Sequence, residues 1–427
     1  SSKIYVPLNE KFSDEKNISI IKSANIDTIL VGKKFLKKIK NFKKSFKKKI
    51  KIIVIDEKVL TEKEVKEIKF EKCRLSNISY IFFTSGSTGS PKGVPITNKN
   101  LINYLNNIKK RFLFNDNDRF SSNFDITFDL FLHDFFLSLT SGAILFIPDK
   151  YYFFNPSKFI QKHKITCWFS VPSLGLNMLN TKQLKNKNLK SLRYTAFCGE
   201  ALPETLVNKW LIAAPKTIID NLYGPTEATL AITGYRWNKN KSHNECENGI
   251  VPIGKIFKGN SFLKKKGKKF ELILKGNQVF KGYLNNKKIN KEKFLKIKGT
   301  SFFKTGDLIQ INKSKNLIFM GRLDRQIKVR GFRIEPQEIE NIIKKTLGVS
   351  EVVVIGWPPI TNNKFSFENI IAFIRTNKIL SEIKILKKIS KKLSFNQIPK
   401  KVITLKKFHY NINKKVDYNY LINFLKK

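Results

Sequence analysis

A short stretch near residue 85 limits the possible folds of this chain more than any other part of its sequence. An apolar run leads directly into glycines, hydroxyl side chains and a lysine, in the order Ile81-Phe82-Phe83-Thr84-Ser85-Gly86-Ser87-Thr88-Gly89-Ser90-Pro91-Lys92-Gly93. The pattern predicts a buried strand followed by a loop whose N–H and hydroxyl groups surround a polyphosphate. The common ATPase P-loop is excluded, because Gly-Lys-Ser/Thr does not follow at its spacing. A solvated Ser/Gly turn is the alternative interpretation.

The rest of the chain alternates short β-rich runs with longer helical stretches, which predicts an α/β fold with largely parallel sheets. The chain has 427 residues and is 41% hydrophobic, which is enough for two or three domains and too apolar for a disordered protein. Expected strands include Ile50–Ile55, Ile144–Ile147 and Val352–Ile355, and a helix is expected over Asn98–Arg111. Glycines punctuate residues 262–284, which predicts a small antiparallel β unit there.

The alternation restarts after Gly321. A helix over residues 333–346, a strand over Ile370–Thr376 and a Lys-rich helix that ends near Leu393 are predicted. We therefore expect a domain boundary near residues 322–325, with a large domain over 1–322 and a small domain over 323–427.

The charge is extreme, with 82 basic against 33 acidic residues and a net charge of +49. Only ten of the basic residues are Arg, and the 72 Lys are spread over the whole chain. A specific nucleic-acid surface would cluster its charge and use Arg, so specific nucleic-acid binding is not expected. Lys33–Lys51, with eleven Lys around a helical apolar stripe, predicts an amphipathic helix. This helix either packs on its domain or contacts an anionic membrane or an acidic partner.

Four Cys without zinc-ligand spacing exclude a disulfide scaffold and a zinc module, and they indicate a reducing compartment such as the cytoplasm. No apolar run of about 18 residues occurs, so no transmembrane segment is expected.

The loop around residue 85 resembles the phosphate-loop signature of the adenylate-forming, or AMP-binding, superfamily of acyl- and aryl-CoA synthetases, luciferases and amino acid adenylation domains. Four further motifs resemble those of the family and follow in its order: Asn221-Leu222-Tyr223-Gly224-Pro225-Thr226-Glu227, Lys304-Thr305-Gly306-Asp307-Leu308, Gly321-Arg322-Leu323-Asp324-Arg325-Gln326-Ile327-Lys328 and Asn413-Lys414-Lys415-Val416-Asp417. Residues 197–203 and 223–229 are most similar to D-alanine–D-alanyl carrier protein ligases and to adenylation domains of nonribosomal peptide synthetases.

The resemblance implies the adenylate-forming fold, with a large α/β domain that includes a small β-barrel part and a small, mobile α+β domain at the C-terminus. It also implies a reaction in two steps. An amino acid first reacts with ATP and Mg²⁺ to give aminoacyl-AMP, and the phosphopantetheine thiol of a carrier protein then accepts the aminoacyl group.

By the same resemblance, individual residues take nucleotide-binding roles. The phosphates are expected to contact Thr84, Ser85, Gly86, Ser87, Thr88, Gly89 and Lys92. Adenine is expected to stack on Tyr223 beside Gly199, Glu200 and Ala201, with Asn221 and Gly224 close by. Thr226 is expected to bind the α-phosphate, Glu227 with Thr88 to bind Mg²⁺, and Asp307 to bind the ribose. Arg322 is expected to contact both ribose and phosphate. Lys415 is expected to catalyse the first step, and Asp324 and Arg325 are expected to form a hinge.

Asp129 carries the substrate expectation, because a carboxylate in an apolar pocket needs a cation such as an α-ammonium. A helix-capping Asp is the alternative. The resemblance places the other pocket walls at Leu130, His133, Phe169, Ala196, Cys198, Leu222, Leu230 and Ala231, which fit a small or medium neutral side chain. Cys198 is expected to be a wall rather than a nucleophile, since no activating base accompanies it.

The chain departs from the family at its start, because Tyr5-Val6-Pro7-Leu8 resembles a motif normally found well inside the first subdomain. We expect a shortened large domain, either a fragment or a pared-down enzyme. No carrier-protein signature occurs, so the carrier is expected in trans or on an unseen part of the chain. Two alternatives remain open: an acyl- or aryl-CoA synthetase, and a non-catalytic remnant of the fold that binds polyanions.

Overall fold

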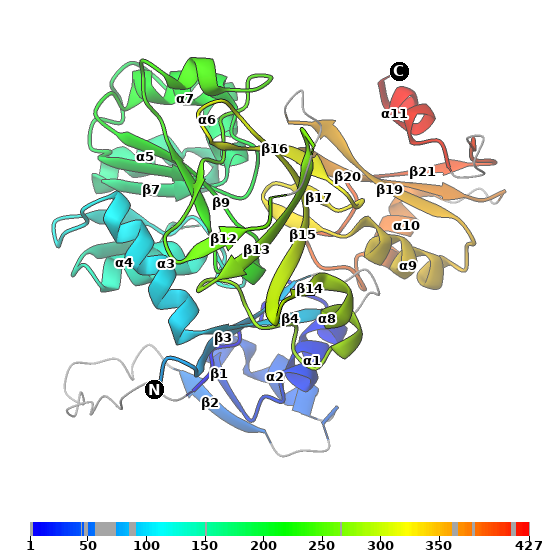
Figure 1. Ribbon diagram of the computed structural model, residues 1–427. Helices are drawn as coiled ribbons and strands as arrows, with labels where there is room; N and C mark the ends of the chain where they lie inside the picture. Colours follow the sequence, from blue (N-terminus) through cyan, green and yellow to red (C-terminus); the bar gives the residue numbers. More distant parts are fainter. Residues whose placement is uncertain are drawn as a thin grey trace.

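The computed structural model arranges the chain as successive units around a shared centre (Figure 1). It describes residues 3–43, 45–46, 50–55, 74–84, 91–149, 152–264, 267–360, 366–377, 381–410 and 416–426. The N-terminal unit lies at the bottom of the view, the blue-green α/β unit at the upper left, and the orange and red C-terminal unit at the right.

The N-terminal unit pairs two parallel strands with two helices: α1 (Asp14–Ser23), β1 (Thr28–Gly32), α2 (Leu36–Lys43) and β2 (Lys51–Ile55). The predicted helix over Lys33–Lys51 is therefore too long, because β2 already begins at Lys51. Ile39 and Phe42 of α2 are buried against Ile29 of β1. This packing confirms that the apolar stripe of the basic helix covers its own domain.

A hairpin joins this unit to the next one. Its strands β3 (Ile78–Thr84) and β4 (Lys92–Thr97) are antiparallel, and α3 (Asn98–Arg111) follows at once with the predicted bounds. Thr97 caps α3, and its side chain and that of Asn100 close a reciprocal capping box.

The largest sheet has the strand order β11-β10-β9-β8-β7-β5-β6. Its strands are β5 (Arg119–Ser121), β6 (Ile144–Phe146), β7 (Cys167–Ser170), β8 (Tyr194–Phe197), β9 (Ile218–Tyr223), β10 (Thr233–Arg236) and β11 (Lys255–Ile256). The ladders from β6 to β9 are parallel, as predicted, and those of β10 and β11 are antiparallel.

Two hydrophobic cores cover the two faces of this sheet. Alternate residues of β7 point to opposite faces, so Phe169 joins the core with α3 and α4 (Phe131–Leu139), whereas Trp168 joins the other core. The second core is built on α5 (Pro156–His163), α6 (Pro172–Asn180) and α7 (Glu204–Ala213).

An antiparallel sheet follows and confirms the β unit expected near residues 262–284. It consists of β12 (Asn260–Phe262), β13 (Phe270–Gly276), β14 (Phe294–Ile297), β15 (Thr300–Ile311) and β16 (Leu317–Arg322), with α8 (Lys287–Lys293) before β14. The long strand β15 pairs with β13, β14 and β16, so it is the centre of this sheet.

The last unit is a mixed sheet of β17 (Ile327–Val329), β18 (Phe332–Ile334), β19 (Val352–Pro359), β20 (Ser366–Arg375) and β21 (Lys401–Leu405). Helices α9 (Pro336–Leu347) and α10 (Glu382–Ile389) contribute to one core, and α11 (Tyr418–Lys426) contributes to another. The helix predicted over 333–346 starts later because Pro336 fits the first helical turn. The Lys-rich helix ends at Ile389, before the predicted Leu393.

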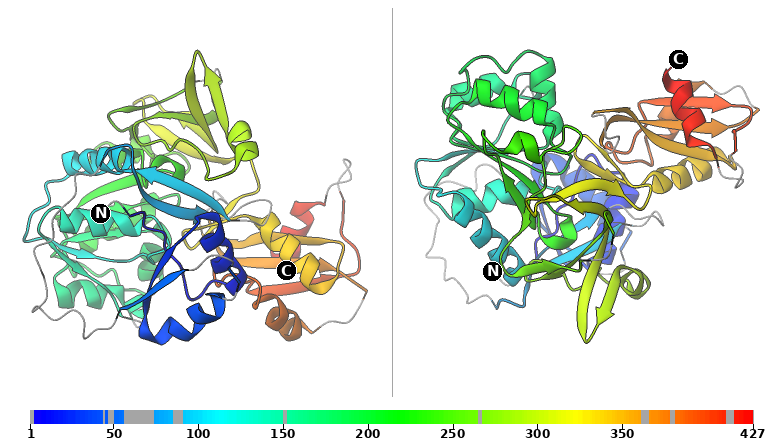
Figure 2. Two further views of the ribbon diagram at one scale, coloured as in Figure 1. Left: turned by 90° about the horizontal axis from the view of Figure 1, so that it is seen from below. Right: turned by 45° about the horizontal axis from the view of Figure 1, so that its top comes forward.

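Figure 2 shows that the β17–β18 side of this sheet faces the rest of the molecule, whereas α11 lies on its outer side. Among the described residues, no helix has the length and apolar character needed to cross a membrane.

Candidate active site

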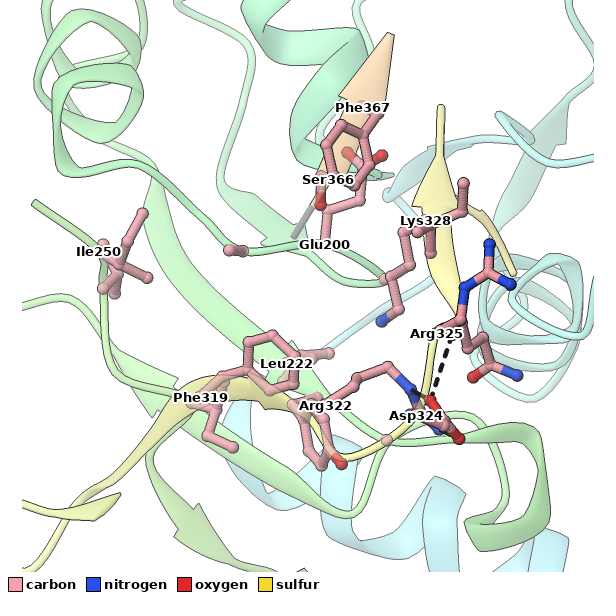
Figure 3. Close-up of a pocket in the computed structure, with 18 residues that line it drawn as sticks. Glu200, Leu222, Ile250, Phe319, Arg322, Asp324, Arg325, Lys328, Ser366 and Phe367 are labelled. Carbon is pink, nitrogen blue, oxygen red and sulfur yellow. Dashed lines mark hydrogen bonds and ion pairs between the residues drawn. The ribbon is translucent and has the colours of Figure 1, made fainter. Parts of the chain in front are cut away.

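The carboxyl ends of the parallel strands meet the C-terminal unit at one cavity of about 220 Å³ (Figure 3). Open α/β sheets bind ligands at this edge. The cavity lining combines segments that follow β8 and β9 with parts of β16, β17 and β20. Its lining includes the predicted nucleotide residues Gly199, Glu200, Ala201, Tyr223, Gly224 and Arg322, together with Leu222 and the predicted hinge residues Asp324 and Arg325.

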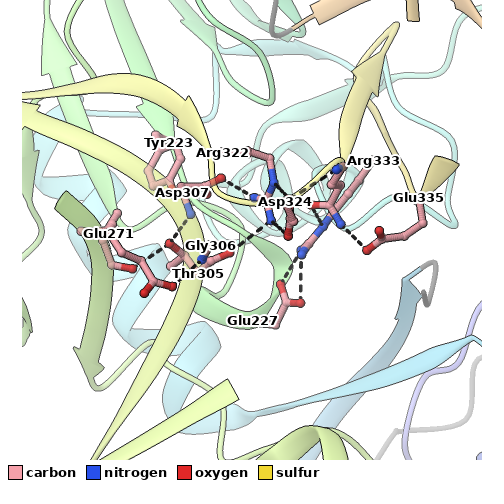
Figure 4. A network of polar contacts seen from close by, with 12 residues as sticks. Tyr223, Glu227, Glu271, Thr305, Gly306, Asp307, Arg322, Asp324, Arg333 and Glu335 are labelled. Carbon is pink, nitrogen blue, oxygen red and sulfur yellow. Dashed lines mark hydrogen bonds and ion pairs between the residues drawn. The ribbon is translucent and has the colours of Figure 1, made fainter. Parts of the chain in front are cut away.

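One polar network crosses the floor of this site (Figure 4). The Tyr223 hydroxyl donates to Asp307, and Arg322 forms an ion pair with the same carboxylate. Arg322 also donates to Asp324 from Nε at 2.7 Å and from Nη2 at 2.8 Å. The sequence motifs for adenine, ribose and hinge are thus brought together in direct contact. Burial, together with the Asp307 charge, raises the pKa of Tyr223 well above its usual value, so its hydroxyl remains a donor.

Glu227 lies at the centre of a second network. It sits in a short 3₁₀ turn, Thr226–Ala228, after β9, and is 0% exposed. Arg333 donates from Nη1 to both carboxylate oxygens, at 3.1 and 2.9 Å, and the Tyr283 hydroxyl donates to Oε1 at 2.6 Å. Burial alone would raise the pKa of Glu227, but the Arg333 charge and the Tyr283 hydrogen bond hold it below its usual value. The side chain is therefore an anion paired with a guanidinium.

The ends of the predicted phosphate loop lie beside this second network. Thr84 ends β3 and pairs with Lys92, the first residue of β4, so these two members of the predicted phosphate set lie side by side. Lys92 Nζ lies 6.0 Å from the centre of the Tyr283 ring. Burial, opposed by the charges of Glu335 and Glu227, lowers the pKa of Lys92. Residues 85–89 of the predicted phosphate set lie outside the described residues.

Asp129 lies just before α4 and is 4% exposed. Burial raises its pKa to about 6, although the polar groups of Thr226 and Leu130 oppose this shift. Within the described residues Asp129 forms no ion pair with a Lys, Arg or His side chain. A helix cap does not describe this carboxylate, because the residue that caps α4 is Leu130.

The predicted pocket walls are all buried, and all of them except His133 belong to the core that includes Phe169. They are Leu130, His133, Phe169, Ala196, Cys198, Leu222, Leu230 and Ala231. His133 stacks on Phe169 with ring centroids 3.9 Å apart, and it shares a 2.6 Å hydrogen bond with Tyr104. Burial lowers the pKa of His133 to about 3, so the ring is a neutral wall. Burial raises the pKa of Cys198 to about 12, which agrees with a wall rather than a nucleophile.

Glu200 has a contact that the sequence did not reveal. Its carboxylate accepts from the backbone N–H of Ser173 at 2.8 Å and from that of Gly331 at 2.6 Å. Gly331 lies between β17 and β18 and has φ +82°, and a Cβ added at this position would lie 2.5 Å from Val171 Cγ1. Only glycine fits this position, and its N–H ties the C-terminal sheet to the large α/β unit.

Two further residues received no role from the sequence: Lys328 stood in the hinge motif without one, and Gln278 was missed. Lys328 of β17 extends into the cavity (Figure 3), and burial lowers its pKa while the Asp307 charge opposes this shift. Gln278 is 0% exposed and donates to the Ala231 carbonyl at 2.7 Å, so it supports the backbone after Glu227. Lys415, the predicted catalytic residue, lies outside the described residues.

Comparisons with known proteins agree with these motifs. The sequence profile of the family described as "AMP-binding enzyme" matches residues 2–284. The chain is 33% identical over 389 residues to a D-alanine–D-alanyl carrier protein ligase of Lactococcus lactis subsp. lactis (strain IL1403), covering 88% of this chain and 76% of that protein. It is 32% identical over 351 residues to the ligase of the same name from Listeria monocytogenes serovar 1/2a (strain ATCC BAA-679 / EGD-e), covering 79% and 68%.

Solved structures show the same fold. The Vibrio cholerae adenylation domain AlmE, crystallised with glycyl-adenosine-5'-phosphate, superposes with a TM-score of 0.88 at 28% identity over 99% of this chain and 84% of that one. The Bacillus subtilis o-succinylbenzoate CoA synthetase superposes with a TM-score of 0.81 at 21% identity over 98% and 83%, which is a likeness of fold alone. The chain is an adenylate-forming enzyme and belongs to the AMP-binding enzyme family.

Proposed function

We propose that this protein activates an amino acid with ATP as an aminoacyl-AMP and then transfers the aminoacyl group to the phosphopantetheine thiol of a carrier protein. Asp129 is the observation that carries the proposal. A buried carboxylate that forms no ion pair with any described residue is costly, and the α-ammonium of an amino acid would supply a cation through a charge-assisted hydrogen bond. The acyl and aryl acids of CoA synthetases bring no such group.

The substrate side chain in this proposal is small and neutral. The predicted walls are buried and uncharged, and among them His133 and Phe169 stack on each other. The relatives named above are D-alanine ligases, and the AlmE structure contains a glycyl adenylate. Alanine, in either configuration, and glycine are therefore the first candidates.

The nucleotide roles follow from the contacts and the family motifs. Asp307 would accept the ribose hydroxyls, a task for a carboxylate with two acceptor oxygens. Tyr223 would stack on adenine beside the backbone of residues 199–201, and Arg322 would hold ribose and phosphate. Residues 84–89 and Lys92 would bind the phosphates of ATP.

A divalent metal fits the donor type of the proposed site but not its present contacts. Glu227 offers the oxygen ligands that Mg²⁺ prefers, with Thr88 as the second proposed ligand. Both Glu227 oxygens already accept hydrogen bonds from Arg333. Glu227 would therefore hold the metal only after Arg333 withdraws. The metal itself would neutralise charge on the phosphates.

Lys415 would stabilise the negative charge that develops as the carboxylate attacks the α-phosphate. The neighbours of its segment, Tyr410 and Val416, form a bridge. Val416 packs against the core that contains α11, whereas the β17–β18 hairpin contributes to the other core of the C-terminal unit. We therefore propose that the unit after residue 322 rotates about Asp324 and Arg325 between the two steps, presenting the Lys415 segment first and the hairpin second.

The test is ATP–pyrophosphate exchange over a panel of free L- and D-amino acids, with fatty and aryl acids as controls. We expect exchange with one or two small amino acids. The same enzyme should then load that amino acid onto a phosphopantetheine-bearing carrier protein, measured as the increase in carrier mass.

Two results contradict the proposal. Exchange only with acids that lack an amino group would assign the chain to the CoA-synthetase branch. A folded protein that neither exchanges nor binds ATP, but binds DNA with an affinity that falls steeply with salt, would indicate a polyanion-binding remnant.

A further inference from the structure

The β17–β18 hairpin places a guanidinium on Glu227 (Figure 4). Arg333 belongs to β18, and its partner belongs to the turn after β9, 106 residues earlier in the chain. Glu227 is 0% exposed and Arg333 has a side-chain exposure of 22%. The contact therefore joins the C-terminal unit to the candidate metal ligand of the large α/β unit.

Side chains of the C-terminal unit orient the guanidinium of Arg333. Arg333 Nε donates to Gln326 Oε1 at 2.6 Å, and Gln326 in turn donates to Glu335. The backbone N–H of Gln326 donates to Asp324, so the network that aims Arg333 is connected to the hinge. A rotation at the hinge would move Arg333 and its supports together.

Two other contacts hold the same hairpin against the large α/β unit, and neither of them involves Glu227. The N–H of Gly331 donates to Glu200, and the ring of Phe332 stacks on Phe128 with centroids 5.9 Å apart. Arg333 is thus the residue of the hairpin that supplies a cation where the proposed metal would be bound.

We propose that Arg333 and the divalent metal compete for Glu227, with Arg333 acting as a tethered cation that replaces the metal when the hairpin docks. The proposal rests on the function proposed above, in which Glu227 is a metal ligand. A carboxylate with no exposure needs one cation to remain charged, and a metal and a guanidinium placed together on it would repel each other. The two cations therefore exclude each other.

This competition links the two chemical steps. Without a bound metal, Glu227 keeps the Tyr283 hydrogen bond but has no cationic partner until Arg333 reaches it, which would favour docking of the hairpin. By reciprocity, docking of Arg333 must weaken metal binding by the same factor. Arg333 is in this sense a positioning residue for the thiol-transfer arrangement rather than a catalytic one.

The experiment measures metal binding directly. Mn²⁺ is titrated into the full chain with saturating α,β-methylene-ATP, and free Mn²⁺ is followed by electron paramagnetic resonance. In Arg333→Gln the competitor is gone, so we expect the half-saturating Mn²⁺ concentration to fall about threefold to tenfold. Arg333→Lys keeps a charge but loses the planar fork, so an intermediate fall is expected.

Arg330→Gln is the matched control. Arg330 lies in the same hairpin and carries the same charge, but it donates to Glu368 and Asn369 within the C-terminal sheet. Its removal should leave the half-saturating Mn²⁺ concentration unchanged, which separates the Arg333 contact from a general loss of positive charge.

An unchanged or higher half-saturating Mn²⁺ concentration in Arg333→Gln overturns the proposal, as does an equal fall in Arg330→Gln. If circular dichroism shows that the Gln variant is unfolded, the Lys variant decides by the same criterion. Failure of the proposed function is read separately, from wild-type pyrophosphate exchange. An active wild type with unshifted Mn²⁺ binding in the variants refutes the competition alone.

Discussion

Asp129→Asn should make the protein more stable at neutral pH while it removes the preference for amino acids. The pKa of Asp129 is about 6 in the folded protein against a usual value of 3.8. The folded state therefore binds more protons than the unfolded state between these pH values, so stability falls as the pH rises through this window. Two pKa units correspond to a free energy of about 3 kcal/mol. The wild type loses this amount of its free energy of unfolding above pH 6, whereas the Asn variant does not.

The assay is thermal unfolding of both proteins between pH 4 and pH 8 without ligands. For a chain of this length about 3 kcal/mol corresponds to a rise of about 3 °C in Tm. We expect this rise at pH 7.5 and its disappearance near pH 4, where the carboxyl group of Asp129 is protonated in both states. In pyrophosphate exchange, loss of the charge-assisted hydrogen bond should lower kcat/KM for the amino acid about 10- to 100-fold.

Asp134→Asn provides the control for activity. Asp134 lies on α4, is 1% exposed, and has two carboxylate oxygens without a hydrogen-bond partner among the described residues. Burial raises its pKa well above the usual value, so its replacement also removes a buried carboxyl group but should leave the exchange reaction unchanged. A Tm of Asp129→Asn at or below that of the wild type across this pH range, with unchanged amino acid dependence, would refute the reasoning.

Three other substitutions test separate parts of the site. Asp307→Ala should raise the KM for ATP about tenfold or more, because two ribose hydroxyls lose a charged acceptor; an unchanged nucleotide dependence would remove its proposed role. Lys415→Ala should abolish pyrophosphate exchange but leave thioester formation from supplied aminoacyl-AMP largely intact, and equal loss of both steps would contradict its assignment. Gly331→Ala places a Cβ 2.5 Å from Val171 at φ +82°, so it should slow carrier loading much more than exchange, and equal effects on both would show that hairpin docking serves both steps.

Much of the fold was predictable because local signals were strong. The bounds of α3 agree with the prediction because a capping box and a clear helical period mark Asn98–Arg111. The basic segment at Lys33–Lys51 misled the prediction because its apolar spacing fits a helix up to Ile50, although Lys51 already pairs with Thr28 in a parallel ladder. Such pairing is a tertiary contact, and periodicity within the segment does not report it.

The candidate site was predictable only where a motif lies within one continuous segment. Asp307, Arg322 and Tyr223 were each found from their own motif, and the structure brings them into contact. Arg333 and Tyr283 were missed because their partner, Glu227, is distant in sequence and no spacing rule connects them. The neutral state of a buried group likewise depends on its surroundings and not on its position in a motif.

The use of arginine in this chain was a signal that could have pointed to Arg333. Lysine outnumbers arginine by 72 to ten, so arginine occurs where lysine does not serve equally well. Seven of the ten form ion pairs with a carboxylate among the described residues: Arg111, Arg193, Arg236, Arg322, Arg325, Arg333 and Arg375. A guanidinium is needed at such sites because its planar fork satisfies a buried carboxylate through several hydrogen bonds, whereas an ammonium acts as a point charge.

Four of the ten arginines fall between residues 322 and 333, the stretch that links the proposed hinge to the hairpin. In so basic a chain the net charge therefore says little about function. The positions at which Arg occurs instead of Lys indicate the segment where hydrogen-bond geometry is important.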